Sequence, residues 1–425
     1  MDRETDALAC HTRIESDMTV ILPSKESRVL TLGTRNTYET DGEKGLGLAM
    51  DIGTTTVAAY LMDMESGREL ARTARLNPQR IHGADVITRL NYCLQNTENQ
   101  LRLKTEIDAL KNEIGDELLK KAGIEAPLTA CALVGNTVMM HLAGGYDAKG
   151  LAAAPFTPFY TQLHITHCAG TPAFFGGCIS GYVGADTVAA MLACDMDIRP
   201  QTQLLIDIGT NGEIVLKHKG NYTCCSCAAG PAFEGAHISC GTGAVPGAID
   251  HIDPDGSFTT IDNAPVAGIC GSGIVDAISY LVENEQISPV GRMREPFVIS
   301  PEVSIIPADI REVQLAKAAI SAGIEILVND AGIDFKDIDR VYLAGGFGSY
   351  IRIPSACSIG MLPYQIADKI LPVGNAAGDG AKMILLSKNA RDRAEQMRSQ
   401  TRYIELSSQP EFEDCYADHL IFSNE

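Results

Sequence analysis

Apolar runs alternate with short, glycine-containing polar turns along much of the chain, a pattern typical of strands that end in tight turns. One such turn occurs twice: the tetrapeptide Asp-Ile-Gly-Thr begins at Asp51 and again at Asp207, 156 residues later (207 − 51). Each copy stands between two strand-like runs, residues 46–50 and 57–62 for the first copy and 204–206 and 213–217 for the second. The pattern therefore predicts a duplicated strand–turn–strand unit, with one copy in each of two domains.

The remaining segments mix strands with helices. Strands are predicted at 130–134, 341–343 and 370–373, and helices after Ile81, from Ala381, and at 98–122, 138–142, 187–194 and 274–282. Further glycine-rich turns follow the second repeat, at 230–235, 268–273, 344–348 and 375–380. Strands that are interspersed with helices and end in glycines predict an α/β fold.

Length and composition limit the organisation of the chain. A chain of 425 residues is too long for one compact core, so we expect a lead-in at 1–45, a first domain at 46–200 and a second domain at 201–425. The net charge of −20 disfavours nucleic acid and anionic membranes as partners. No apolar run reaches the roughly 18–20 residues that cross a bilayer, and residues 1–6 lack signal-peptide character. We therefore expect a cytoplasmic protein.

The repeated turns carry the groups that hold a phosphate and its magnesium ion. Their candidate phosphate ligands are Gly53, Thr54, Thr55 and Thr56 in the first turn and Gly209, Thr210 and Asn211 in the second. Glycine lets the backbone approach an anion closely, and hydroxyl and amide groups can donate to phosphate oxygens. Asp51 and Asp207 would flank Mg²⁺ and orient a water molecule, which is the catalytic role. No Gly-Lys-Ser/Thr follows either turn, so neither is a Walker loop.

The order of these turns resembles the superfamily of actin, sugar kinases and Hsp70, the ASKHA proteins. In that superfamily two ribonuclease-H-like halves close on ATP, which implies an actin-like ATPase with ATP and Mg²⁺ in a cleft between the halves. The resemblance implies that both repeated turns meet the phosphates and that Gly345, Gly346 and Gly348 line the adenosine pocket. Asp379 would stand at the start of a helix, where it either caps the helix or closes the nucleotide cleft.

Longer motifs sharpen the resemblance. They are Asn77-Pro78-Gln79, Gly83–Arg89, Val134–Leu142, Gly184–Thr187, Ala229–Gly235 and Ala344–Tyr350. Taken in this order, the motifs resemble those of the reductive activators of corrinoid proteins. These activators use ATP in returning cob(II)alamin to cob(I)alamin in methyltransferase systems. The match runs from about Leu46 to Phe422. The resemblance implies an ATPase and docking core whose partner is a corrinoid protein, and it allows a homodimer.

The N-terminal segment departs from that family. Its members usually begin with a plant-type [2Fe–2S] domain, whereas residues 9–13, Ala-Cys-His-Thr-Arg, resemble only the tail of such a domain. The cluster needs four cysteines and Cys10 would supply one, so we expect no iron–sulfur cluster in this chain. A ferredoxin-like protein would then donate the electron, unless the sequence is a truncated form.

Several residues keep two interpretations open. A loop at 235–243 would reach the corrinoid, and there Ser239 either presents its hydroxyl to cobalt or is a plain turn residue. Arg80, Asp85 and Arg89 would lie along one helix face, which either contacts the nucleotide or partner or forms a solvated, self-paired surface. Structural roles are expected for Phe233 and Glu234.

The thirteen cysteines, in a chain without a signal peptide, indicate buried or free thiols. Residues 224–227, Cys-Cys-Ser-Cys, contain a C-x-x-C spacing, but no second such pair exists, so the end of a strand is favoured over a metal site. A strand followed by a turn is likewise favoured over metal ligands for His164, His167 and Cys168.

Three alternatives remain at this point. A small-molecule kinase of the same fold would need a catalytic aspartate, and Asp186 has no obvious substrate partners. A nucleotide-dependent interaction module would need a client-binding domain, which the sequence does not suggest. Activators of 2-hydroxyacyl-CoA dehydratases share the fold and bind a [4Fe–4S] cluster, whose ligands Cys240 and Cys270 would have to mimic.

Overall fold

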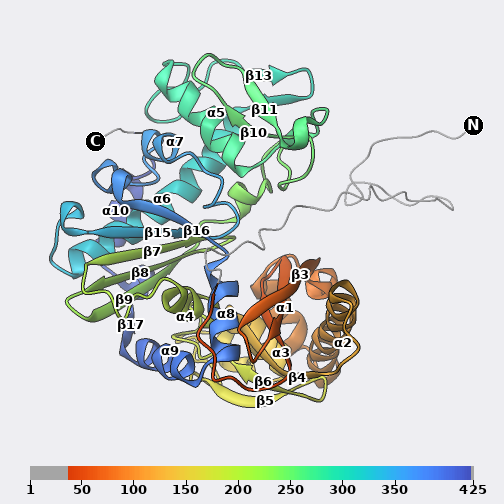
Figure 1. Cartoon of the computed structure of the whole chain (residues 1–425). Helices are drawn as coiled ribbons and strands as arrows, with labels where there is room; N and C mark the ends of the chain where they lie inside the picture. The colour runs from red at the N-terminus through yellow and green to blue at the C-terminus, as the bar shows by residue number, and fades with distance from the viewer. Residues whose placement is uncertain (1–36, 423–425) are drawn as a thin grey trace, which may run out of the picture.

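The computed structural model describes residues 37–422. Most of the predicted lead-in, including Cys10, lies outside these residues. Within them the chain forms two lobes, each built on a six-stranded sheet (Figure 1). The predicted α/β class is confirmed.

The first sheet is built around the first repeated turn. Its strand order is β3 (Arg68–Leu76), β2 (Thr56–Asp63), β1 (Leu46–Ile52), β4 (Leu128–Gly135), β6 (Thr171–Phe175) and β5 (His164–Cys168). Strand β1 pairs antiparallel with β2 and parallel with β4. The central strands β1 and β4 are largely buried, as continuous apolar runs predict. Strand β3 was not predicted, because this edge strand is rich in arginine and partly exposed and so has no apolar run.

Five strands of the second sheet repeat this topology, and its sixth strand, β17 (Thr401–Tyr403), lies at the other edge. Its order is β16 (Ile370–Gly374), β15 (Arg340–Ala344), β7 (Gln203–Ile208), β8 (Gly212–His218), β9 (Asn221–Cys227) and β17. Strand β7 pairs antiparallel with β8 and parallel with β15, as β1 does with β2 and β4. In the two hairpins Asp51 faces Ala58 and Asp207 faces Glu213. The predicted duplication is therefore confirmed.

The helices cover both sheets. They are α1 (Val86–Leu94), α2 (Thr97–Ala122), α3 (Thr137–Gly144), α4 (Ala185–Ala193), α5 (Gly271–Glu283), α6 (Pro307–Asp330), α7 (Ile353–Ser358), α8 (Ala376–Leu386), α9 (Lys388–Gln400) and α10 (Phe412–Asp418). Helices α4 and α8 pack against each other between the two sheets (Figure 1). None of the described helices combines the length and apolarity that a bilayer crossing requires.

The chain passes between the lobes more than once. Helices α8 and α9 lie in sequence between β16 and β17 of the second sheet, yet their buried residues belong to the same core as the first sheet. Helices α5 and α6 contribute to a separate core on the other face of the second sheet. The expected boundary at residue 200 stays a prediction, because the cores are not divided there.

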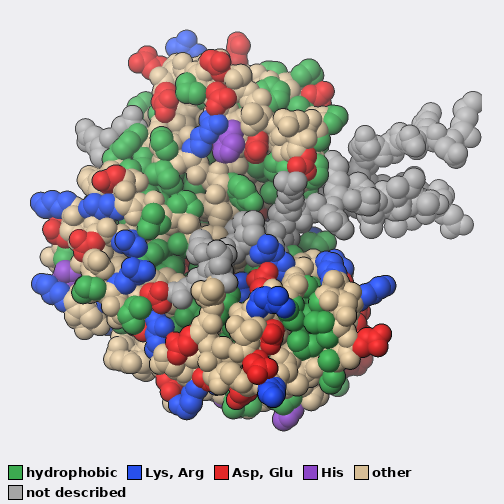
Figure 2. Space-filling model, viewed as in Figure 1, with side chains coloured by type: hydrophobic (Ala, Val, Ile, Leu, Met, Phe, Trp, Pro, Cys, Tyr) green, Lys and Arg blue, Asp and Glu red, His purple; other side chains and the backbone are tan. Residues whose placement is uncertain are grey.

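Smaller strands extend the second lobe above the sheet. A three-stranded sheet has the order β11 (Phe258–Thr260), β10 (Ala248–Ile252) and β12 (Gly268–Ile269), and a hairpin joins β13 (Phe297–Ser300) to β14 (Val303–Ile305). Figure 2 shows acidic and basic side chains interspersed over the visible face of both lobes. The net negative charge is therefore not gathered into one patch on this face.

The prediction that a helix begins only at Ala381 was wrong. Helix α8 begins at Ala376, with the Asn375 side chain accepting a 2.7 Å hydrogen bond from the Gly378 amide. The glycines therefore lie inside the helix, where they permit close packing. An added Cβ at Gly378 would lie 2.6 Å from the Tyr60 hydroxyl, and one at Gly380 would lie 2.1 Å from a backbone oxygen of α4.

Candidate functional site

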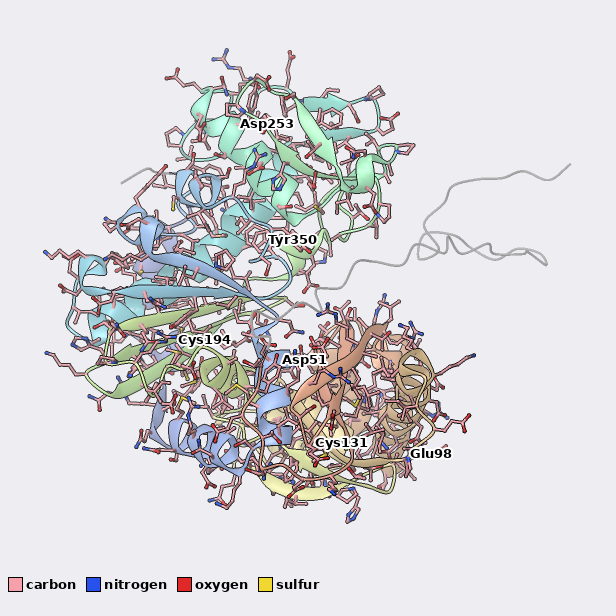
Figure 3. The ribbon with its side chains drawn as sticks, viewed as in Figure 1. Asp51, Glu98, Cys131, Cys194, Asp253 and Tyr350 are labelled. Atoms are coloured by element: carbon pink, nitrogen blue, oxygen red, sulfur yellow. The ribbon has the colours of Figure 1, made fainter. Side chains whose placement is uncertain are left out.

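A cavity of about 600 Å³ lies between the two lobes. Its walls include both repeated turns, the segment after β15 and the N-terminus of α8. Asp51 and Tyr350, which both line it, are labelled in Figure 3 on the lower and upper lobes. A volume of this size is typical of small-molecule sites, which span about 300–1,000 Å³.

Carboxylates from both lobes converge in this cavity. Among the described residues that line it are Asp51 at the end of β1, Asp207 and Glu213 in the β7–β8 hairpin, and Asp186 in the first turn of α4. The Asp207 and Glu213 positions are direct cross-strand neighbours. The two central strands thus end at a common acidic site.

Burial and mutual repulsion disfavour the charged forms of these groups. Burial, with the charges of Asp186 and Asp207, raises the pKa of Asp51 to about 7, although a 3.1 Å hydrogen bond from Asn375 opposes the shift. Burial and Asp186 raise the pKa of Asp207 to about 7. Burial raises the pKa of Asp186 to about 6, and burial with both neighbouring aspartates raises the pKa of Glu213 well above its usual value. A divalent cation would relieve this repulsion, since Mg²⁺ prefers oxygen ligands.

The backbone around the acidic groups is close-packed at two glycines. An added Cβ at Gly53 would lie 2.5 Å from the carbonyl oxygen of Thr56, across the first turn. Gly345 has a φ of +91°, and its Cβ would lie 2.5 Å from the Ile208 carbonyl oxygen and 2.8 Å from Asp207 Oδ1. Both positions therefore exclude any other residue.

The first turn is held in place by polar side chains beneath it. Arg89 is fully buried and donates from Nη2 to the Thr54 carbonyl oxygen at 2.6 Å and from Nε to the Gly83 carbonyl oxygen at 2.8 Å. Asn77 donates to the Gly53 carbonyl oxygen at 2.8 Å, and Asn136 donates to Thr54 Oγ1 at 3.0 Å. The turn is thus preorganised by side chains from three other segments.

The expectation that Arg80, Asp85 and Arg89 share one helix face was wrong. Arg80 is exposed in a 3₁₀ turn, Pro78–His82. Asp85 caps α1 by accepting a hydrogen bond from the Thr88 amide at 2.8 Å. Arg89 points inward and supports the first repeated turn, and the helix begins at Val86, later than the sequence pattern predicted.

An aromatic pair lines the upper part of the cavity. The rings of Phe233 and Phe347 stack with centroids 4.7 Å apart and planes 8° from parallel. Gly345 and Gly346 line the cavity beside Phe347. Phe233, which was expected to be structural, thus also forms part of the cavity wall.

Most of the sequence-predicted site residues are brought together here. Those that line the cavity are Asp51, Gly53, Thr54, Thr55, Thr56, Asp207, Gly209, Thr210, Asn211, Gly345 and Gly346. Glu213, at the end of the segment from Asp207 that was expected to meet the phosphates, lines the cavity too. Sequence reasoning did not assign Asp186, Asn136 and Asn375 to the site, although they line the same cavity. Asn136 and Asn375 have a recognisable signal, since each directly follows a strand and caps the next helix.

Three predicted site residues lie outside the cavity walls. Asp379 is buried in α8, where it pairs with Lys382 Nζ at 2.8 Å and accepts from the Tyr38 hydroxyl at 2.7 Å. Gly348 is buried behind the end of β15. Ser239 is exposed, and its backbone amide donates to Asp309 Oδ1 at 2.7 Å.

The cysteine and histidine segments were correctly predicted as strands. Residues 224–227 form the end of β9, and their cysteines are buried free thiols. His164, His167 and Cys168 lie in β5, and His164 Nε2 lies 2.6 Å from the Tyr146 hydroxyl.

Comparison with protein families decides the assignment. Residues 46–199 match the model of the RACo middle region, and residues 201–425 match the model of the C-terminal domain of RACo, the ASKHA domain. The chain belongs to the RACo family of reductive activators. Both walls of the cavity lie within the matched segments.

Individual relatives agree with this assignment. The chain is 33% identical over 419 residues to the corrinoid activation enzyme RamQ of Eubacterium limosum, covering 89% of this chain and 70% of the relative. It is 25% identical over 401 residues to the [Co(II) methylated amine-specific corrinoid protein] reductase of Methanosarcina barkeri, covering 81% and 71%. A solved reductive activator for a corrinoid, iron–sulfur protein superposes with a TM-score of 0.80 at 32% identity, covering 90% of this chain and 67% of that one. The actin-like fold of this RACo-family chain is thereby confirmed.

Proposed function

We propose that this RACo-family protein couples ATP hydrolysis to the one-electron reduction of a corrinoid protein from cob(II)alamin to cob(I)alamin. The observation that carries the proposal is the acidic cavity between two duplicated turns, in a chain whose relatives are named as corrinoid activators. The reaction has two balanced parts: cob(II)alamin gains one electron, and ATP with water becomes ADP and phosphate.

The acidic group is suited to hold the magnesium ion of Mg-ATP. Asp51 and Asp207 would bind the ion from opposite lobes, directly or through water, with Asp186 and Glu213 beside them. A bound Mg²⁺ supplies positive charge that neutralises the phosphates and acidic groups. The bound ion would also lower the pKa values of Asp51 and Asp207, which are about 7 from burial and carboxylate repulsion, and so keep both carboxylates charged.

The phosphates would lie against backbone donors and helix N-termini. The two turns offer the hydroxyls of Thr54, Thr55, Thr56 and Thr210 and the amide of Asn211. Helices α4 and α8 both begin at the cavity, with Asp186 in the first turn of α4 and Asn375 as the N-cap of α8. Since a helix N-terminus carries partial positive charge, both helices would favour a bound phosphate.

The nucleoside would occupy the opposite part of the cavity. There Gly345 and Gly346 leave space beside the stacked Phe233 and Phe347 rings. An exposed Gly346 with no atom within 4 Å of an added Cβ indicates room along this wall. This arrangement supports adenosine binding by Gly345 and Gly346, whereas Gly348 lies behind the wall.

Hydrolysis of the bound nucleotide would change the contacts between this protein and the corrinoid protein. For one electron, each tenfold change in an equilibrium constant corresponds to about 59 mV, so an uphill reduction needs a coupled energy source or a change in cobalt ligation. Ser239 is exposed on the loop that leads to Thr242 and Gly243 in the cavity wall. We propose this loop as the corrinoid contact, with the electron supplied by a ferredoxin-like donor or a domain of the longer relatives.

The test is anaerobic. The chain is mixed with a cob(II)alamin-loaded corrinoid protein and a reduced [2Fe–2S] ferredoxin, and the cob(I)alamin absorbance is followed with and without ATP. Formation of cob(I)alamin only with ATP supports the proposal, and the Asp51→Asn variant should abolish it. Absence of both cob(I)alamin and corrinoid-stimulated ATP hydrolysis would overturn it.

A further inference from the structure

A second group of possible metal ligands lies where α10 packs on α6. The group consists of Glu325 from α6 with Cys415 and His419 from α10 and its C-terminal end. His419 Nε2 lies 2.8 Å from Glu325 Oε2, and one ligand atom from each residue lies within 4.8 Å of the others. Neither the nucleotide cavity nor the proposed function uses these side chains.

The spacing of the three residues suits a shared ligand. Cys415 and His419 are four positions apart, so they lie on the same face of the helical segment. Glu325 faces them from α6, a 24-residue helix whose other side packs on β8 and β9. The ligands therefore come from two elements, of which one is firmly anchored in the core.

We propose that Glu325, Cys415 and His419 bind a zinc ion. Thiolate, imidazole and carboxylate together are a ligand set that zinc accepts, usually with four ligands in a tetrahedron. Zinc–ligand bonds of about 2.0–2.3 Å place tetrahedral ligand atoms roughly 3.3–3.8 Å apart. The observed separations need only small side-chain movements to meet this geometry, and water would complete the tetrahedron.

The site is accessible to an entering ion. The side chains of His419 and Glu325 are 28% and 37% exposed, and Cys415 is half-buried. Burial raises the pKa of the Cys415 thiol to about 12, and Glu325 and nearby carboxylates contribute to the shift. The thiol therefore carries its proton, and zinc binding forms a Zn–S bond and releases that proton to solvent.

Zinc would fasten α10 to the second lobe. Helix α10 has seven residues, and none of its side chains is buried. So short a helix is marginal without tertiary support. Phe412 and Tyr416 of α10 already pack against the core, and a metal ion shared with α6 would add to that support.

The test uses Co²⁺ as a spectroscopic substitute for Zn²⁺ on the full chain, in excess Mg²⁺. Wild type should bind one equivalent of Co²⁺ with a thiolate-to-cobalt charge-transfer band and the visible bands of tetrahedral cobalt, and Zn²⁺ should displace it. The acidic cavity offers mainly oxygen ligands, but Cys270 also lines it, so the Cys415→Ser variant decides which site gives the thiolate band.

The variants identify the ligands. Cys415→Ser should remove the thiolate band, and His419→Gln should weaken Zn²⁺ binding at least about 100-fold, because even outer-shell changes cost 10–100-fold. Cys240→Ser, which alters another partly exposed cysteine, should behave as wild type. Circular dichroism checks that each variant is folded. If Cys415→Ser is unfolded, the loss of Zn²⁺ affinity in His419→Gln tests the site instead. A wild type without the band, or a Cys415→Ser variant that keeps it, would overturn the proposal.

Discussion

Replacing Asp207 with asparagine should stabilise the nucleotide-free protein while removing its ATPase activity. Asparagine keeps the shape of the side chain but cannot ionise, so it relieves the repulsion from Asp186 and the cost of burying a charge. The same substitution removes a proposed Mg²⁺ ligand from the second turn. The substitution should therefore raise the stability of the protein and lower its ATPase activity.

The size of the stability effect follows from the pKa of Asp207. The value rises from 3.8 in the unfolded chain to about 7 in the folded protein. Since one pKa unit corresponds to about 1.4 kcal/mol, keeping Asp207 charged in the folded protein costs at most about 4 kcal/mol of stability. Water in the cavity screens the partly exposed carboxylate, so we expect roughly half, about 2 kcal/mol. With an unfolding entropy of about 2.1 cal/mol/K per residue, this corresponds to a Tm increase of about 2 °C.

The sign depends on pH in a defined way. Below pH 3.8 the carboxyl group is protonated in both states, and it costs nothing. Between 3.8 and about 7 the unfolded chain releases the proton while the folded protein retains it, so this group lowers stability as pH rises. The full cost is present above pH 7. The advantage of Asp207→Asn should therefore be clear at pH 8 and small at pH 4.

Thermal unfolding without nucleotide measures this effect at both pH values. Asp368→Asn, which alters an exposed aspartate on the segment Tyr364–Lys369, is the matched control and should shift Tm by less than about 1 °C. Mg²⁺ should stabilise wild type more than Asp207→Asn. A variant no more stable than wild type at pH 8, or an equal gain at pH 4, would refute the electrostatic reasoning.

Three further predictions concern the turns and the corrinoid contact. Gly345→Ala should lower ATP affinity at least about tenfold, because its Cβ would collide with the end of β7 at a φ of +91°. In the control Gly346→Ala the added Cβ meets no atom within 4 Å, so this variant should bind ATP nearly normally. A fluorescent-nucleotide titration measures both affinities. Arg89→Met should cost about 3 kcal/mol in denaturant unfolding and weaken ATP binding, since it leaves buried carbonyl oxygens without donors, while the exposed Arg80→Met should change neither. Ser239→Ala should slow ATP-dependent cob(I)alamin formation several-fold and leave basal ATP hydrolysis unchanged; equal loss of both rates would contradict a contact role.

Sequence reasoning succeeded where the chemistry is local. Each Asp-Ile-Gly-Thr turn contains its own carboxylate, glycine and hydroxyl within a few residues, so the pattern can be recognised without knowing what packs around it. The strands β1 and β7 were predicted for the same reason, since their apolar runs are continuous. Duplication then implied the cleft.

It failed where the site depends on tertiary packing. Asp186 begins a helix after a long connection, and only the packing of α4 between the sheets brings it to Asp51 and Asp207. Arg89 was placed on a surface because charged residues usually lie there, but backbone carbonyl oxygens of two turns satisfy its guanidinium inside the protein. Asp379 was a candidate for the cleft because of its sequence position, whereas the helical rotation of α8 directs it toward Lys382.

We propose that the path of the chain couples the bound nucleotide to the angle between the lobes. One passage between the lobes runs from α4 to β7, and another runs from β16 to α8; α4 and α8 pack on each other. Asn375 stands at the second passage and donates to Asp51 Oδ2 at 3.1 Å, a contact that spans 324 residues of sequence. A cation bound by both Asp51 and Asp207 would therefore link the two lobes at the point where the chain crosses between them. Loss of the γ-phosphate would weaken this link and change the angle between the lobes. ATP hydrolysis should therefore change the measured distance between the lobes. The Asn375→Ala variant should show a smaller change in that distance.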